Sequence, residues 1–109
     1  MKVIVEYVDD AGRSPFAKWF RRLDTMAALK VRTGIARMES GNFSNVKPVG
    51  EGVSECRLDF GPGYRIYFGQ DGDTLVILLG GGTKRRQSAD IASAKARWTD
   101  YKARKRGGE

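Results

Sequence analysis

The 109-residue sequence contains no histidine and only one cysteine, and these shortages exclude several kinds of chemistry. Without histidine, no imidazole is present to act as a general acid or base, and the common zinc sites lack their ligands. The single Cys56 cannot close a disulfide within the chain, which is typical of a protein in a reducing compartment. We therefore expect a cytoplasmic protein that holds no metal and no other cofactor.

Long hydrophobic runs are also missing. No apolar run approaches the length of a membrane span, and the N-terminus lacks the apolar core of a signal peptide, so we expect no membrane partner. Residues 80–84 (GGGTK) resemble a glycine-rich phosphate loop only superficially, because the GxxxxGK[ST] spacing is absent. We interpret the three glycines as a flexible exit from a buried strand. With 40% hydrophobic residues, residues 1–109 should form one folded domain.

Positive charge is concentrated near the C-terminus. Residues 1–83 hold 11 basic and 10 acidic residues, whereas residues 84–106 hold nine basic and two acidic ones. Such a patch favours a polyanion, chiefly nucleic acid, or an acidic protein partner. The alternative is a solvated helix with a basic tail at about residues 102–109.

Hydrophobic periodicity predicts the element order β-α-α-β-β-β-α. The predicted strands are residues 2–8, 53–60, 64–68 and 75–79. The predicted helices are a short one that begins at Ser14-Pro15, a longer one over residues 26–40 and a last one over residues 87–105. Tight turns are expected at residues 61–63 and at Asp71-Gly72. The fold class is α+β, a small mostly antiparallel sheet with an N-terminal helical hairpin and a C-terminal helix.

Three further details follow from the spacing of apolar residues. The second helix is expected to turn four residues inward: Met26, Leu29, Ile35 and Met38. The last helix carries a stripe that we expect to be core: Ile91, Ala94, Trp98 and Tyr101. The loop over residues 42–52 has room for a short extended piece at 46–49.

Two arginines on neighbouring predicted strands point to the same side of the sheet. If Cys56 faces the core, strand alternation turns Arg57 to the opposite face, where Arg65 and Tyr67 of the next strand also lie. This arrangement predicts an open cationic sheet face. Guanidinium groups there would hold an RNA phosphate, and Tyr67 would stack on a base or donate its hydroxyl.

Lys84, Arg85 and Arg86 leave the end of the following strand and would close one side of this face. The alternative is ordinary cross-strand pairing of either arginine with Glu55 or Asp59, and the pattern of residues alone leaves both readings open.

Three segments in this order and separation, ECRLDFGPGYRIYF, LLGGGTK and QSADIASAKARW, resemble the RelE/ParE toxin superfamily. More narrowly they resemble its HigB-like addiction module killer branch, which is related to phage proteins. The resemblance spans residues 3–101 and is strongest over residues 55–98. It implies a toxin of a type II toxin–antitoxin module whose partner is a helix-turn-helix antitoxin. Many such toxins are metal-independent endoribonucleases that cut mRNA in the ribosomal A site.

The resemblance also implies roles for individual residues. Arg65 would stabilise the charge of the phosphorane transition state, and Arg57 would position the RNA backbone. Lys84, or Arg85 in the other register, would neutralise the leaving oxygen. Tyr67 or Glu55 would carry protons. Arg85, Arg86 and Lys95 are the expected RNA-binding cations.

The sequence departs from the RelE pattern at two positions. A second basic residue of that pattern falls on Glu55, and a C-terminal tyrosine falls near Ile91. The competing class is a ParE-like inhibitor of DNA gyrase without nuclease activity, which the same fold and basic helix would serve. A third reading is a toxin that only binds its antitoxin.

Overall fold

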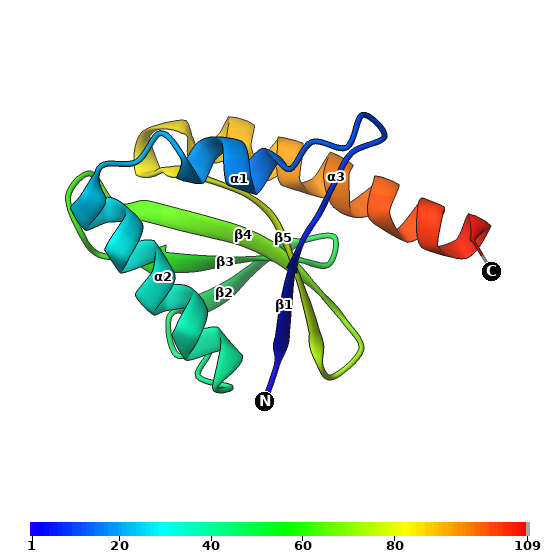
Figure 1. Cartoon of the computed structure of the whole chain (residues 1–109), viewed down its shortest axis with the longest axis horizontal. Coiled ribbons are helices and arrows are strands. Elements are labelled where there is room, and N and C mark those ends of the chain that lie inside the picture. The colour runs from blue at the N-terminus through cyan, green and yellow to red at the C-terminus, as the bar shows by residue number, and fades with distance from the viewer. Residues whose placement is uncertain (109) are drawn as a thin grey trace.

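The computed structural model describes residues 1–108 as a five-stranded sheet with helices on both faces (Figure 1). The elements in chain order are β1 (Val3–Glu6), α1 (Pro15–Phe20), α2 (Thr25–Glu39), β2 (Val46–Gly50), β3 (Val53–Leu58), β4 (Tyr64–Asp71), β5 (Leu75–Thr83) and α3 (Gln87–Gly107). A short 3-10 turn, Lys84–Arg86, joins β5 to α3. The strand order is β1-β5-β4-β3-β2, with β1 parallel to β5 and the other pairs antiparallel. The predicted α+β class is confirmed.

Both N-terminal helices begin where the sequence places a capping residue. The hydroxyl of Ser14 accepts a hydrogen bond from the backbone N–H of Ala17 at 3.0 Å, and proline follows at the first helical position. A carboxylate oxygen of Asp24 accepts from the N–H of Ala27 at 2.8 Å. These bonds satisfy backbone donors that have no partner within the helix.

The two predicted tight turns are present and set the register of the sheet. Glycine occupies the left-handed positions, with φ of +55° at Gly61, +81° at Gly63 and +73° at Gly72. The first turn joins β3 to β4 and places Arg57 opposite Arg65 and Glu55 opposite Tyr67. This register decides which side chains meet at the site described below.

The sheet carries a separate apolar core on each face. On one face, β3, β4 and β5 pack against helices α1 and α2, and the helical side chains buried there are Phe16, Ala27, Val31 and Met38. On the other face, the sheet packs against Ala94 and Trp98 of α3, with Ile91 and Tyr101 partly buried beside them. The expected core stripe of the last helix is confirmed.

The interior face of α2 differs from the prediction. Met26 and Leu29, expected to point inward, are each 53% exposed, whereas Met38 is buried. The buried positions are instead Ala27, Val31, Gly34 and Met38. Gly34 lies so close to β3 that an added Cβ would be 2.8 Å from Leu58. The small residues Ala27 and Gly34 therefore help to decide which side of α2 approaches the sheet, and Met26 and Leu29 lie outside that contact.

Two elements extend beyond their predicted ends, and one strand is added. The extended piece at residues 46–49 is confirmed as β2, which pairs with β3. α3 continues to Gly107, so residues 102–107 of the expected basic tail are helical; Glu109 lies outside the described residues. Figure 1 shows the last turns of α3 projecting past the sheet.

The sequence predicted that this strand ends at residue 79, before the three glycines. In the structure, β5 runs through the glycines to Thr83. A bulge shifts its pairing with β4, so that Phe68 lies opposite Leu78 and Tyr67 opposite Gly80. β1 pairs with β5 only from Leu75 to Leu78. Beyond Leu78, that edge of β5 therefore has no strand partner among residues 1–108.

Within the described residues, no helix is long and apolar enough to cross a membrane. In the same range, no three histidine, cysteine, aspartate or glutamate side chains gather as a metal ion requires.

Candidate functional site

The predicted cationic face of the sheet is covered by α3. Glu55 is fully buried, Tyr67 is 1% exposed and Arg65 is 6% exposed. Ala94 and Trp98 of α3 pack over this face together with Tyr67. The strand alternation was predicted correctly, but the expectation of an open face was wrong because a helix distant in sequence lies on it.

Arg65 is held in this layer by Glu55. The Nε atom of Arg65 lies 3.4 Å from a carboxylate oxygen of Glu55, and both side chains are buried. The other carboxylate oxygen accepts a hydrogen bond from the side-chain amide of Gln87 at 2.9 Å. A buried guanidinium requires a compensating charge. The acidic residue at position 55 is therefore the structural partner of Arg65, and the alternative of cross-strand pairing is confirmed for this pair.

One end of Arg65 nevertheless reaches a surface depression at the β3–β4 turn, which we call the turn depression. It has a volume of about 380 Å³ and is lined by Arg57, Asp59, Arg65, Lys84 and the turn residues 60–63. A Cβ added at Gly63 would lie 3.5 Å from Nη1 of Arg65 and 3.6 Å from Lys84. The backbone N–H of Lys84 donates to the carbonyl of Gly63 at 2.9 Å, which fixes Lys84 beside the turn.

Three of the four predicted catalytic residues thus meet at one place. Arg57 and Lys84 are exposed there, and Arg65 contributes from below with its guanidinium oriented by Glu55. Asp59 is the carboxylate that lines the depression, and the resemblance to the toxin family implies no catalytic role for it. The arrangement can bind a phosphate group from three sides.

Tyr67, the fourth predicted catalytic residue, lies away from this surface. Its hydroxyl is buried without a hydrogen-bond partner. Burial, followed by the nearby charges of Glu55 and Asp90, raises the pKa of Tyr67 to about 12, although Arg65 opposes the shift. Stacking on a base or carrying a proton for a bound RNA does not fit this position, so these predictions are wrong.

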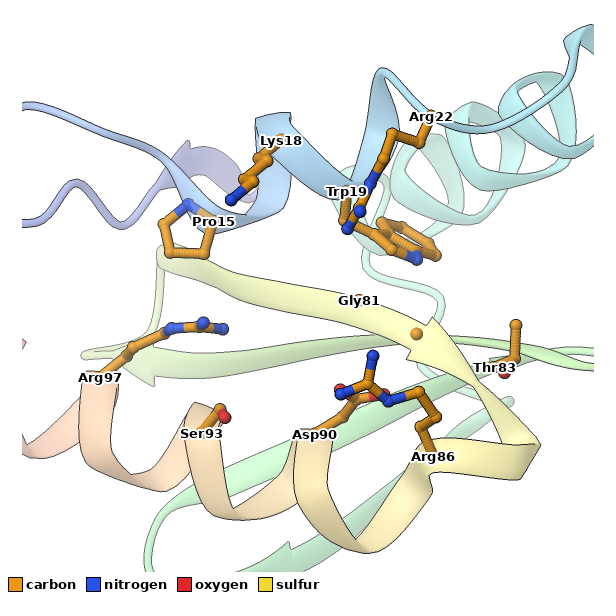
Figure 2. Close-up of a pocket in the computed structure, with 11 residues that line it drawn as sticks. Pro15, Lys18, Trp19, Arg22, Gly81, Thr83, Arg86, Asp90, Ser93 and Arg97 are labelled. Atoms are coloured by element: carbon orange, nitrogen blue, oxygen red, sulfur yellow. The ribbon is translucent and has the colours of Figure 1, made fainter.

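A second hollow, of about 320 Å³, lies between α1 and α3 along the free edge of β5 (Figure 2). We call it the glycine cleft because Gly81 and Gly82 form its floor. Figure 2 shows Lys18 of α1 and Arg22, just after this helix, at one side of the cleft. The residues that line it from the α3 side are Arg86, Asp90, Ser93 and Arg97. Four cations and one carboxylate make the cleft strongly positive.

The glycines of this floor are required by close packing. A Cβ at Gly81 would overlap the ring of Trp19, and one at Gly82 would overlap the carboxylate of Asp90. A Cβ at Gly80 would lie 2.8 Å from the Nη1 atom of Arg97. The interpretation of these glycines as a flexible exit was therefore wrong: they allow side chains of α1 and α3 to lie directly on the strand backbone.

Two of the charged residues of the cleft, Arg97 and Asp90, are partly desolvated. Nη1 of Arg97 donates to the carbonyl of Leu79 at 3.0 Å, and burial lowers the pKa of this arginine. Burial also raises the pKa of Asp90, although Arg86 and Arg97 oppose that shift. Because Arg97 has already lost part of its hydration, its electrostatic contact with an anionic ligand would be strengthened.

The three predicted RNA-binding cations fall in different places. Arg86 lines the glycine cleft, and Arg85 is exposed in the turn before α3. Lys95 lies over β2, where its Nζ is 3.2 Å from the position of a Cβ on Gly50, so it joins neither hollow.

Sequence reasoning missed Lys18, Arg22 and Arg97. The available signal was their spacing: Lys18 and Arg22 are four residues apart, and polar residues recur at intervals of four, three and four from Arg86 into α3.

The chain is a small α+β protein with two surface hollows, each lined by several cations. No family model matches the chain. An uncharacterized protein of Haemophilus influenzae is 42% identical to it over 81 residues, which cover 73% of this chain and 82% of that protein. The chain belongs to the same family as this relative.

Proposed function

We propose that the protein is the toxin of a type II toxin–antitoxin module, of the RelE/ParE superfamily and its HigB-like branch, and that it cleaves mRNA on the ribosome. The observation that carries the proposal is the meeting of Arg57, Arg65 and Lys84 at the turn depression. These residues lie on two strands and at the end of a third, in the segments that resemble the toxin family. Their convergence on one surface supports a common task.

The chemistry proposed is attack of a ribose 2′-hydroxyl on the adjacent phosphorus. A bond forms between the 2′-oxygen and phosphorus, the bond to the 5′-oxygen of the next nucleotide breaks, and a 2′,3′-cyclic phosphate remains. Asp59 accepts the proton of the 2′-hydroxyl, and the ammonium group of Lys84 gives a proton to the leaving 5′-oxygen. Arg57 and Arg65 stabilise the charge that develops on the phosphorane oxygens.

The pair of Glu55 and Arg65 contributes preorganisation. Because Glu55 holds Nε of Arg65 from within the protein, the opposite side of the guanidinium faces the depression at Gly63. A guanidinium that is already oriented does not need to reorganise when negative charge builds up on the phosphate in the transition state.

The proposed partners follow from this function. The substrate is mRNA held by the ribosome, which requires a cytoplasmic location, and the module includes a helix-turn-helix antitoxin. The positive charge of residues 84–106 suits ribosomal RNA, and it also suits an acidic segment of the antitoxin.

A gyrase inhibitor of the ParE type is the second candidate, and one observation favours it. Tyr67 and Glu55, the expected proton carriers, are buried, so acid–base chemistry depends on Asp59 and Lys84 alone. A binding inhibitor would need no proton carrier.

Expression of the protein in bacteria tests the proposal. Arg57→Ala and Lys84→Ala should each abolish growth arrest, and primer extension on a host transcript should show cuts aligned with codons only for the active protein. Arg21→Ala is the matched control, because Arg21 is exposed and lines neither hollow. Growth arrest with intact transcripts and an SOS response would favour the gyrase inhibitor instead.

A further inference from the structure

The glycine cleft is separate from the proposed catalytic residues, and none of its cations takes part in the chemistry described above. We propose that it binds a nucleotide of single-stranded RNA adjoining the cleaved phosphate, with the base on Trp19 and the phosphate held by Lys18, Arg22 and Arg86. This inference rests on the proposed function for its choice of RNA as the ligand. It adds a binding subsite that positions the substrate strand.

The first support is the combination of side chains. Recognition of single-stranded RNA pairs an aromatic ring, on which a base stacks, with cations that hold the backbone. Trp19 is partly exposed and lines the cleft, and the Gly81 backbone supports its ring from beneath. Lys18, Arg22 and Arg86 are exposed and surround the same space (Figure 2).

The second support is the backbone at the floor. Gly81 and Gly82 lie on the edge of β5 that has no strand partner in the part of the chain described. Because Trp19 and Asp90 lie over these two glycines, a ligand would approach the backbone of β5 from its unpaired edge. The backbone N–H and C=O groups at an unpaired strand edge can form hydrogen bonds with a ligand.

The third support is continuity with the turn depression. Thr83 lines the glycine cleft and the next residue, Lys84, lines the turn depression. Gly82 of the cleft floor is also the cross-strand partner of Arg65. A strand of RNA that crosses the end of β5 would place successive nucleotides in the two hollows. A small anion would occupy only one hollow at a time.

Binding is tested apart from cleavage by using an RNA that cannot react. The probe is a fluorescein-labelled single-stranded oligoribonucleotide of about eight nucleotides, with 2′-O-methyl groups that remove the attacking hydroxyl. Fluorescence anisotropy should show that Lys18→Ala/Arg22→Ala weakens binding by about tenfold or more and lowers the slope of log affinity against log salt by about two. The control Arg13→Ala/Arg21→Ala removes the same charge from exposed positions outside the cleft and should leave the affinity within about twofold at physiological salt.

Stacking of a base on Trp19 is tested separately by tryptophan fluorescence. The chain has two tryptophans, and Trp98 is packed in the core under α3, so RNA should quench mainly Trp19. Trp19→Leu should remove this quenching and weaken binding, while its thermal melt shows that it remains folded. Quenching that persists in Trp19→Leu would contradict the stacking role.

Three outcomes would overturn the cleft proposal. One is equal RNA affinity of the cleft variant and the wild type. Another is an equal loss of affinity in the control. The third is displacement of the RNA by poly-glutamate of the same total charge at the same concentration, which would mark the cleft as a site for an acidic protein segment. RNA binding in the cleft without mRNA cleavage by the wild type would leave the cleft proposal standing and contradict the proposed function.

Discussion

Breaking the buried pair of Glu55 and Arg65 should destabilise the protein far more than removing the exposed cations beside it. Glu55 and Arg65 lie within 3.4 Å of each other, and both are almost completely excluded from solvent. Glu55→Leu leaves the guanidinium buried without its partner, and Arg65→Met leaves the carboxylate buried in the same way. Gln87 also loses its acceptor when Glu55 is replaced.

The expected cost is large compared with the stability of a domain of this size. Removing one partner of a buried ion pair costs about 3–5 kcal/mol, and a lost side-chain hydrogen bond adds about 1 kcal/mol. Domains of about 100 residues are stable by about 5–15 kcal/mol. Each single variant should therefore lose about a fifth or more of the free energy of unfolding, and Glu55→Leu the larger share because only it also loses the bond to Gln87. The double variant Glu55→Leu/Arg65→Met buries no unpaired charge and should recover most of it.

Urea denaturation followed by circular dichroism measures the four proteins of this double-mutant cycle. We expect a coupling free energy of about 2 kcal/mol or more between the two sites. Single variants within about 1 kcal/mol of the wild type, or additive losses in the double variant, would refute the reasoning that Glu55 neutralises Arg65. A large coupling would also mean that loss of toxicity in Arg65→Ala cannot separate chemistry from folding. Arg57 and Lys84 are then the appropriate probes.

Three further predictions concern the contact between α3 and the sheet. Tyr67→Phe removes a buried hydroxyl without a partner, so growth arrest should be retained and stability should be unchanged or slightly higher. Because the pKa values of Tyr67 and Tyr101 are both raised to about 12, the folded state keeps phenol protons that the unfolded chain loses above pH 10. Stability should therefore fall from pH 10 to pH 12, less steeply in Tyr67→Phe, and an unchanged slope in urea titrations would count against this. Gly69→Ala would place a Cβ 2.6 Å from the Trp98 ring and should destabilise the protein by about 1–3 kcal/mol; a melting temperature equal to that of the wild type would show that Trp98 can move.

The local features of the fold were predictable from sequence because each rests on neighbouring residues. Ser14 and Asp24 cap their helices, and glycines at the β3–β4 turn adopt left-handed φ values, as the residue types indicate. The alternation of β3 and β4 correctly placed Arg57, Arg65 and Tyr67 on one side of the sheet.

The features that were not predictable depend on contacts between distant segments. Strand alternation shows which residues share a face, but it does not show that α3 covers Tyr67 while leaving Arg57 exposed. In the same way, the three glycines of β5 have a packing role only because Trp19 and Asp90, from two different helices, lie against that strand. The glycine cleft exists only where these helices meet.

The most direct test of the central claim uses purified protein and ribosomes programmed with an end-labelled mRNA. The wild-type protein should cut the mRNA at the ribosomal A site and leave a 2′,3′-cyclic phosphate. Arg57→Ala and Lys84→Ala should each reduce the rate by at least about a hundredfold, as expected for groups that stabilise the transition state, and Arg21→Ala should cut at the normal rate. Intact mRNA after incubation with a wild-type protein that still arrests growth in cells would contradict the account.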